Sequence, residues 1–296
     1  MPRTDANGIE IEYDLFGSES DRPLLLIMGL GAQMILWDDE FCSQLAAGGH
    51  RVIRFDNRDV GLSTKLDHAP APSPLKLMQA RLAGETLEVP YTLEDMADDA
   101  AGLLDALEIE RAHVAGASMG GMIAQTLAVR HPARVRSLTS IMSTTGNPNL
   151  PPATPEAMAV LLEPPPTERA AAIERGVAVS RVIGSPGFPF DEARIRERST
   201  RLYDRAFYPI GVARQMAAIM AGESRVEALG SLRVPALVIH GDADPLVPVE
   251  GGKDTCEAIP GAELLLIEGM GHDMPPETWP RITRAIGELT GKAEIG

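Results

Sequence analysis

The chain has 296 residues, 44% of them hydrophobic, which suits one large α/β domain, or one domain with an insertion, around a sizeable core. Its formal net charge of −15 repels phosphate backbones and anionic lipid surfaces, so nucleic acid is excluded as an expected partner. The two cysteines form no disulfide or metal-ligand pattern, and no apolar run reaches the length of a signal peptide or a transmembrane helix. These features predict a cytoplasmic protein with no stable membrane insertion.

The hydrophobic pattern predicts a series of strands. Residues 9–15 alternate between apolar and acidic side chains, which is typical of a strand with one face toward solvent. Short apolar runs without alternation suit strands that are buried on both faces, and they occur at residues 24–28, 52–55, 112–115, 138–142, 236–240 and 264–267. Helical patterns lie between them, one of which Thr92 and Asp95 can cap. This alternation predicts a doubly wound, mostly parallel sheet.

The alternation is interrupted between residues 146 and 228. Amphipathic helical patterns extend over about residues 168–183, 191–207 and 211–223, and no run there is typical of a buried strand. Prolines are concentrated near the start of this segment, at Pro148, Pro151, Pro152, Pro155, Pro164, Pro165 and Pro166. The sequence therefore predicts a helical cap at residues 146–228, inserted into a core domain of residues 1–145 and 229–296.

A candidate nucleophile lies in the sequence Gly-Ala-Ser-Met-Gly at residues 116–120, which has the pattern G-x-S-x-G. A predicted strand precedes it and a helical pattern follows, so Ser118 is expected at a sharp strand-to-helix turn with its hydroxyl exposed. Side chains two positions to either side of Ser118 would collide, which explains Gly116 and Gly120. The backbone N–H of Met119, at the helix start, is expected to point toward an oxyanion.

A serine nucleophile needs a base, and the base needs an acid that orients it. His272 follows the apolar run 264–267, at the sheet edge where the carboxyl ends of parallel strands meet, which is also the edge expected for Ser118. His50 and His68 are expected in loops, and His113 at the opposite end of its strand. Asp242 and Asp244 both follow the run 236–240, and either is in a position to reach His272.

Together these motifs resemble the carboxylesterases of the α/β-hydrolase fold, the group that includes aclacinomycin methylesterase. The resemblance covers most of the chain, is weakest in the cap, and is carried by residues 26–30, 55–64, 116–120, 241–248 and 269–272. It implies that Asp244 is the acid and that the N–H of Leu30 is a second oxyanion donor. Many relatives have His-Gly where this chain has Met28-Gly29, a change that leaves the backbone donor at Leu30 in place.

Several further side chains are candidates for contact with substrate. Tying loops together is the favoured interpretation of Arg58, with substrate contact as the alternative. Trp37 and Phe41 are candidates for the acyl side of the pocket, although core packing explains them equally well. The aromatic residues of the cap are candidates for the roof of the pocket, and core packing explains most of them equally well. They are Phe188, Phe190, Tyr203, Phe207 and Tyr208.

The sequence thus predicts a serine carboxylesterase for small to medium neutral esters, which works through a Ser118–His272–Asp244 triad and an acyl-enzyme and needs no cofactor or metal. The same triad also serves thioester, lactone, amide or carbon–carbon cleavage, or acyl transfer, because fold and triad do not fix the bond. A ligand receptor on the same fold is a third interpretation, which turnover of an activated ester would separate from an enzyme. The small-molecule ester is the expected partner, and a homodimer is left open.

Overall fold

The computed structural model describes residues 1–70, 72–73, 77, 79–80, 83–85, 87–164 and 166–295; Pro165 and Gly296, assigned above to the cap and the core, lie outside these residues. An eight-stranded sheet runs through the described part of the chain in the order β1-β2-β4-β3-β5-β6-β7-β8. Its strands are β1 (Arg3–Ala6), β2 (Ile9–Phe16), β3 (Arg22–Ile27), β4 (His50–Phe55), β5 (Ala112–Ala117), β6 (Val135–Ile141), β7 (Ala236–Gly241) and β8 (Glu263–Ile267). β1 and β2 pair antiparallel with their neighbours, and all other neighbouring strands are parallel. The predicted α/β class and mostly parallel sheet are confirmed.

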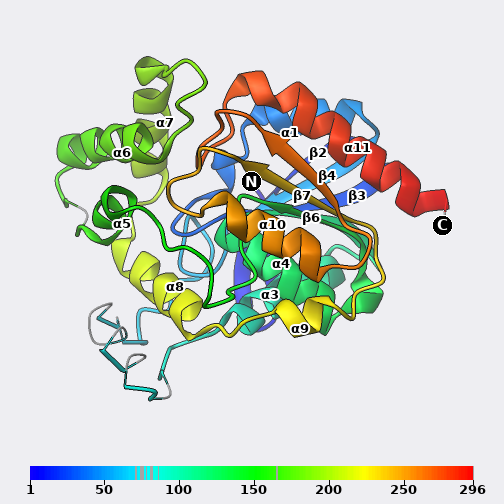
Figure 1. Cartoon of the computed structure of the whole chain (residues 1–296), viewed down its shortest axis with the longest axis horizontal. Coiled ribbons are helices and arrows are strands. Elements are labelled where there is room, and N and C mark those ends of the chain that lie inside the picture. The colour runs from blue at the N-terminus through cyan, green and yellow to red at the C-terminus, as the bar shows by residue number, and fades with distance from the viewer. Residues whose placement is uncertain are drawn as a thin grey trace.

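Helices cover both faces of the sheet (Figure 1). One face carries α1 (Asp39–Ala47) and α11 (Trp279–Ile295), and the other carries α3 (Leu93–Ala106), α4 (Met119–Arg130), α9 (Val226–Leu229) and α10 (Val249–Ala258). A separate hydrophobic cluster lies on each side of the strands. Because both faces of the sheet are covered, the sequences of the central strands are continuous apolar runs. Thr92 and Asp95 form the predicted capping box at the start of α3.

The last strand differs from the prediction of burial on both faces. Within the described residues β8 pairs with β7 alone, so it forms an edge of the sheet. The side chains of Leu264 and Leu266 in this edge strand are exposed. The apolar run identified the strand correctly but not its place at the edge of the sheet.

Four helices gather at one end of the sheet, between β6 and β7 in the chain (Figure 1). They are α5 (Pro155–Leu162), α6 (Arg169–Ile183), α7 (Glu192–Arg205) and α8 (Pro209–Ala221), and all lie within the segment predicted to form a cap. We refer to them and their connections as the cap helices. Helix α9 crosses the predicted boundary at residue 228, and its Leu229 belongs to the hydrophobic cluster on the α3–α4 side of the sheet. No helix in the described ranges is long and apolar enough to cross a membrane.

Buried histidines are part of the fold rather than of its surface. His50, expected in a loop, is the first residue of β4 and is buried, with its Nε2 at 2.8 Å from Oγ1 of Thr290. His113 is fully buried in β5, where its Nδ1 lies 2.8 Å from Oγ of Ser137. Its Nε2 lies 3.1 Å from a carboxylate oxygen of Glu294. Burial lowers the pKa of His113 to about 4, against the opposing effect of Glu294.

We expect the free energy of unfolding to decrease as the pH falls from 6.5 to about 4, the range between the ordinary pKa of histidine and that of His113 in the folded chain. The unfolded chain binds a proton on this residue in that range while the folded chain does not, which amounts to at most about 3 kcal/mol. Denaturant unfolding at a series of pH values measures the slope. His113→Gln should flatten it, and an unchanged slope in this variant would assign the acid sensitivity to other groups.

Candidate active site

The turn between β5 and α4 holds Ser118 in a strained backbone conformation. Its φ is 55° and its ψ is −122°, a left-handed conformation that residues other than glycine rarely adopt. A Cβ on Gly116 would lie 2.0 Å from the carbonyl oxygen of Gly120, and a Cβ on Gly120 would lie 2.0 Å from that of Ile27. The turn therefore closes only with glycine at both positions, which is the steric reason expected from the sequence.

A chain of hydrogen bonds joins the three predicted site residues. Oγ of Ser118 lies 2.9 Å from Nε2 of His272, and Nδ1 of His272 lies 2.7 Å from Oδ2 of Asp244. A carboxylate accepts hydrogen bonds, so Nδ1 carries the proton and Nε2 is free to accept the proton of the serine. The three residues come from the ends of β5, β7 and β8, and the parallel sheet brings these ends to one edge.

The structure separates the two aspartates that the sequence left open. Asp244 is buried, and its Oδ1 accepts hydrogen bonds from the backbone N–H groups of Leu246 and Val247, both at 2.9 Å. These two bonds orient Oδ2 toward His272. Asp242 instead accepts a hydrogen bond of 2.7 Å from the backbone N–H of Gly269, and thereby joins the loops after β7 and β8. Asp244 therefore contacts His272, and Asp242 stabilises the loops around it.

His240 is the last residue of the apolar run 236–240, and it lies directly behind Asp244. It is fully buried, and its Nε2 donates a hydrogen bond of 2.8 Å to the carbonyl oxygen of Val247. The same nitrogen lies 3.7 Å from Oδ2 of Asp244. Burial lowers the pKa of His240, which keeps the imidazole neutral beside the carboxylate. The apolar run contained no signal that its last residue would support the loop of Asp244.

Two backbone N–H groups adjoin Ser118 as candidate oxyanion donors. Met119 begins α4 immediately after the serine. On the other side, a Cβ built on Gly29 would lie 3.1 Å from Cβ of Ser118 and 3.6 Å from its Oγ, so the loop that carries Leu30 borders the serine. Among the described residues, the backbone N–H groups of Leu30 and Met119 donate no hydrogen bond to the protein. Both groups therefore remain available to an oxygen next to Ser118.

Several other residues that the sequence offered as substrate contacts instead stabilise the fold. Arg58 forms a buried, two-pronged ion pair with Asp99, at 2.6 and 2.7 Å, which ties its loop to α3. Trp37 and Phe41 have no exposed surface and stack on each other with ring centroids 5.6 Å apart, so they belong to the core and do not line a pocket. Of the cap aromatics, Phe188 packs against the same core cluster, whereas Phe190 and Phe207 are exposed.

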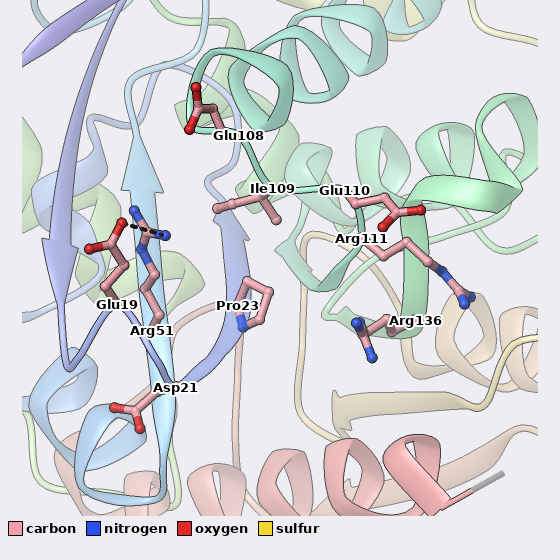
Figure 2. Close-up of a pocket in the computed structure, with 9 residues that line it drawn as sticks. All are labelled: Glu19, Asp21, Pro23, Arg51, Glu108, Ile109, Glu110, Arg111 and Arg136. Atoms are coloured by element: carbon pink, nitrogen blue, oxygen red, sulfur yellow. Dashed lines mark ion pairs between the residues drawn. The ribbon is translucent and has the colours of Figure 1, made fainter.

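A cavity of about 210 Å³ lies away from Ser118, at the end of the sheet where the parallel strands begin (Figure 2). It is bordered by Pro23, Arg51 and Arg136, which stand at the amino-terminal ends of β3, β4 and β6. The charges around it are mixed, and Arg51 is 4.0 Å from Glu19. Ligands of parallel sheets bind at the carboxyl ends of the strands, so this cavity is not the candidate active site.

Within the described ranges no cluster of three or more His, Cys, Asp or Glu side chains is placed to hold a metal ion.

Comparisons with known proteins agree with this architecture. The family model of the alpha/beta hydrolase fold matches residues 22–180, and a model of TAP-like proteins matches residues 218–279. Rhodomycin D methylesterases from Streptomyces sp. (strain C5) and Streptomyces peucetius are each 30% identical to this chain, with 94% of both chains covered. A meta-cleavage product hydrolase from Pseudomonas fluorescens IP01 superposes with a TM-score of 0.76 at 21% identity, with 99% of this chain and 98% of that chain covered.

The enol-lactonase from Burkholderia xenovorans LB400 is a second solved structure of similar shape, with a TM-score of 0.73 at 21% identity over 98% of this chain and 100% of that chain. At such identities the two structures support the fold alone. The family model and the methylesterases, by contrast, match in sequence as well. The resemblance inferred from the motifs is confirmed, and the chain belongs to the α/β-hydrolase fold family.

Proposed function

We propose that this protein is a serine carboxylesterase in which Ser118 is the nucleophile, His272 the general base and Asp244 the residue that orients the base. The hydrogen-bonded series from Asp244 through His272 to Ser118, at 2.7 and 2.9 Å, is the observation that carries the proposal. Its position on a strained turn, with two free backbone N–H groups beside it, supplies the other parts that acyl transfer needs. The similarity to methylesterases supports an ester as the substrate.

The reaction proceeds in two similar steps. Oγ of Ser118 attacks the ester carbonyl carbon while Nε2 of His272 takes the hydroxyl proton. The carbonyl oxygen becomes an oxyanion, which the N–H groups of Leu30 and Met119 stabilise. The tetrahedral intermediate collapses, the alcohol leaves with the proton from His272, and an acyl-enzyme remains. Water then attacks this ester in the same way, and it releases the acid and free Ser118.

The substrate that we propose is a neutral or weakly polar ester of small to medium size. The cap helices stand at the end of the sheet that carries Ser118, so we expect them to limit the room for a polymer. A site of about 300–1,000 Å³ holds a drug-sized ester but not a folded protein. Two relatives are named as methylesterases, so a methyl ester is the first alcohol portion to test.

A panel of esters tests the substrate proposal. We expect kcat/KM for p-nitrophenyl esters to peak at short to medium acyl chains and to decrease steeply beyond them, because the cap limits the length of the pocket. Methyl and larger alkyl esters of one acid, measured in parallel, define the preferred alcohol. The Ser118→Ala variant serves as the blank for background hydrolysis. If long-chain triglycerides or folded proteins are the best substrates, the site is an open groove and the proposed substrate class is wrong.

We also propose that the protein works in the cytoplasm. Both cysteines are free, and burial raises the pKa of the Cys42 thiol to about 12, so this side chain is unreactive. A fold that uses no disulfide has no need of an oxidising compartment. Fractionation of the producing cells tests the location, and recovery of the protein mainly from the medium or the envelope would contradict it.

A further inference from the structure

The loop of residues 29–33, which we call the oxyanion loop, carries the proposed donor Leu30 between β3 and α1. The core holds the loop at both ends. Before it, the carbonyl oxygen of Met28 accepts a hydrogen bond of 2.9 Å from Nδ2 of Asn57. After it, the backbone N–H of Met34 donates to Oδ1 of Asp56 at 2.8 Å. These contacts fix where the loop begins and ends, but neither contacts its middle.

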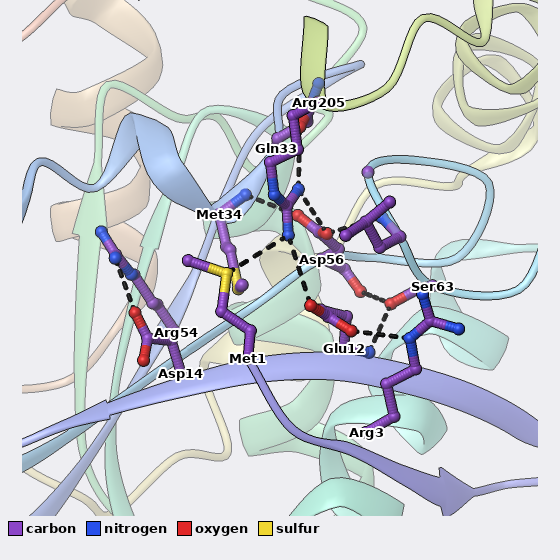
Figure 3. Close-up of polar contacts among 12 residues, drawn as sticks. Met1, Arg3, Glu12, Asp14, Gln33, Met34, Arg54, Asp56, Ser63 and Arg205 are labelled. Atoms are coloured by element: carbon purple, nitrogen blue, oxygen red, sulfur yellow. Dashed lines mark hydrogen bonds and ion pairs between the residues drawn. The ribbon is translucent and has the colours of Figure 1, made fainter. Parts of the chain in front are cut away.

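The cap holds the loop at its far end through Gln33 (Figure 3). Nε2 of Gln33 donates to the carbonyl oxygens of Leu202 and Ala206 at the end of α7, at 2.7 and 2.8 Å. Oε1 of Gln33 accepts a hydrogen bond of 2.8 Å from Arg205, whose guanidinium also pairs with the buried carboxylate of Asp56 at 2.7 Å. Helix α7 is therefore anchored on the loop three residues beyond Leu30.

The middle of the oxyanion loop is held by helix α8. Oε1 of Gln215 accepts a hydrogen bond of 2.7 Å from the backbone N–H of Gly31, which immediately follows Leu30. Nε2 of the same side chain donates to the carbonyl oxygen of Arg58 at 2.8 Å, and Gln215 is fully buried. Gly31 has a φ of 65°, and a Cβ there would lie 2.9 Å from Val212 of α8. The loop thus turns against α8 in a conformation that a glycine allows.

We propose that Gln215 is a positioning residue for the oxyanion hole, through which the cap sets the direction of the Leu30 N–H. The inference rests on the proposed esterase function. Fixing the N–H of Gly31 fixes the peptide on the carboxyl side of Leu30, one Cα away from the peptide that carries the proposed donor. Because Nε2 of Gln215 donates to the carbonyl oxygen of Arg58, its amide is fixed and does not shift when the loop moves. The cap is therefore part of the catalytic geometry and not only a roof.

Misplacement of an oxyanion donor weakens the transition state and leaves the bound ester largely unaffected. We expect Gln215→Met to lower kcat/KM about 10- to 100-fold, which is less than the loss of a complete donor. A trifluoromethyl ketone of the substrate acyl group is the second probe. Ser118 adds to its carbonyl carbon, the serine proton passes to His272, and the ketone oxygen becomes an oxyanion. Its affinity should fall by a similar factor, while that of the matched methyl ketone, used as a ground-state mimic, changes little.

Gln125→Met is the matched control. Gln125 is equally buried and bridges Oγ of Ser140 at 3.1 Å and Nε of Arg225 at 3.0 Å, and among the described residues it makes no hydrogen bond to the oxyanion loop. This variant should have a melting temperature lowered as much as that of Gln215→Met but should retain both kcat/KM and inhibitor affinity. If Gln215→Met does not fold, Gln215→Asn tests the same point, because its amide is one methylene too short to span both partners.

The outcomes separate the two proposals. Wild-type kcat/KM and trifluoromethyl ketone affinity in folded Gln215→Met would overturn the positioning role and leave the esterase assignment intact. Equal losses in the Gln125 and Gln215 variants, with the methyl ketone weakened as much as the trifluoromethyl ketone, would assign Gln215 a purely structural role and overturn the inference. If the wild type hydrolyses no ester and does not add to the trifluoromethyl ketone, the esterase function is wrong and this inference fails with it.

Discussion

Replacement of Ser118 by alanine is expected to lower kcat by a factor on the order of 10⁶ while the protein stays folded. In the proposed mechanism Oγ of Ser118 is the atom that attacks the ester, and the variant offers His272 no other proton to take at that position. The side chain is small and partly exposed, so its loss removes little packing. Burst kinetics with a p-nitrophenyl ester should also disappear, because no acyl-enzyme forms.

Ser143→Ala is a matched control for this prediction. Oγ of Ser143 donates a hydrogen bond of 2.8 Å to the carbonyl oxygen of Ser118, so the variant disturbs the same turn but leaves the nucleophile in place. We expect its kcat to fall by no more than about tenfold, in keeping with the loss of a single neutral hydrogen bond. More than about a tenth of wild-type activity in Ser118→Ala, with contamination excluded, would contradict the role of Ser118 as nucleophile.

Asp244→Asn should lower kcat by about 10⁴ with little change in the structure. The carboxylate only accepts hydrogen bonds, and this keeps the proton of His272 on Nδ1. An asparagine presents an N–H₂ group to the same nitrogen, which favours the tautomer with the proton on Nε2. That tautomer is unable to take the proton of Ser118. Activity and thermal unfolding are measured together, so that a catalytic defect is distinguished from unfolding.

The neighbouring aspartate provides the comparison. Asp242→Asn retains an oxygen that accepts from the N–H of Gly269, and the structure shows no contact of Asp242 with His272 among the described residues. We therefore expect this variant to keep kcat within about tenfold of the wild type, as is common for the loss of one charge in a structural hydrogen bond. A larger loss in Asp242→Asn than in Asp244→Asn would show that the acid has been assigned to the wrong residue.

Much of the fold is encoded in local patterns. Apolar runs, apolar–acidic alternation and helical periodicity identify seven of the eight described strands and the long cap helices, because burial leaves a direct record in the residue types. The exception is β1, whose residues Arg3–Ala6 form no apolar run. The pattern of the serine turn is equally short, since Gly116, Ser118 and Gly120 are only two positions apart, although a Cβ on Gly120 would meet the distant carbonyl oxygen of Ile27. The order of the predicted site residues along the chain also carries the resemblance to the family.

The contacts across the fold are different, because they depend on where side chains from distant segments point. Two aspartates follow β7, and local sequence does not tell which one reaches His272; the backbone N–H groups of Leu246 and Val247 make that choice. Gln215 lies 184 positions from Gly31 in the chain, and nothing in its own helix indicates the contact. Trp37 and Phe41 have the residue types of a pocket wall or a core equally, and only packing places them in the core.

Residue types at short spacing were therefore enough to predict seven of the eight described strands, the strained serine turn and the family. The contacts between distant segments show which aspartate faces His272, which strand forms the edge of the sheet, and how the cap holds the oxyanion loop. The physical reason is that a hydrogen bond depends on distances of a few tenths of an ångström between groups far apart in the chain, and residue spacing carries no such information.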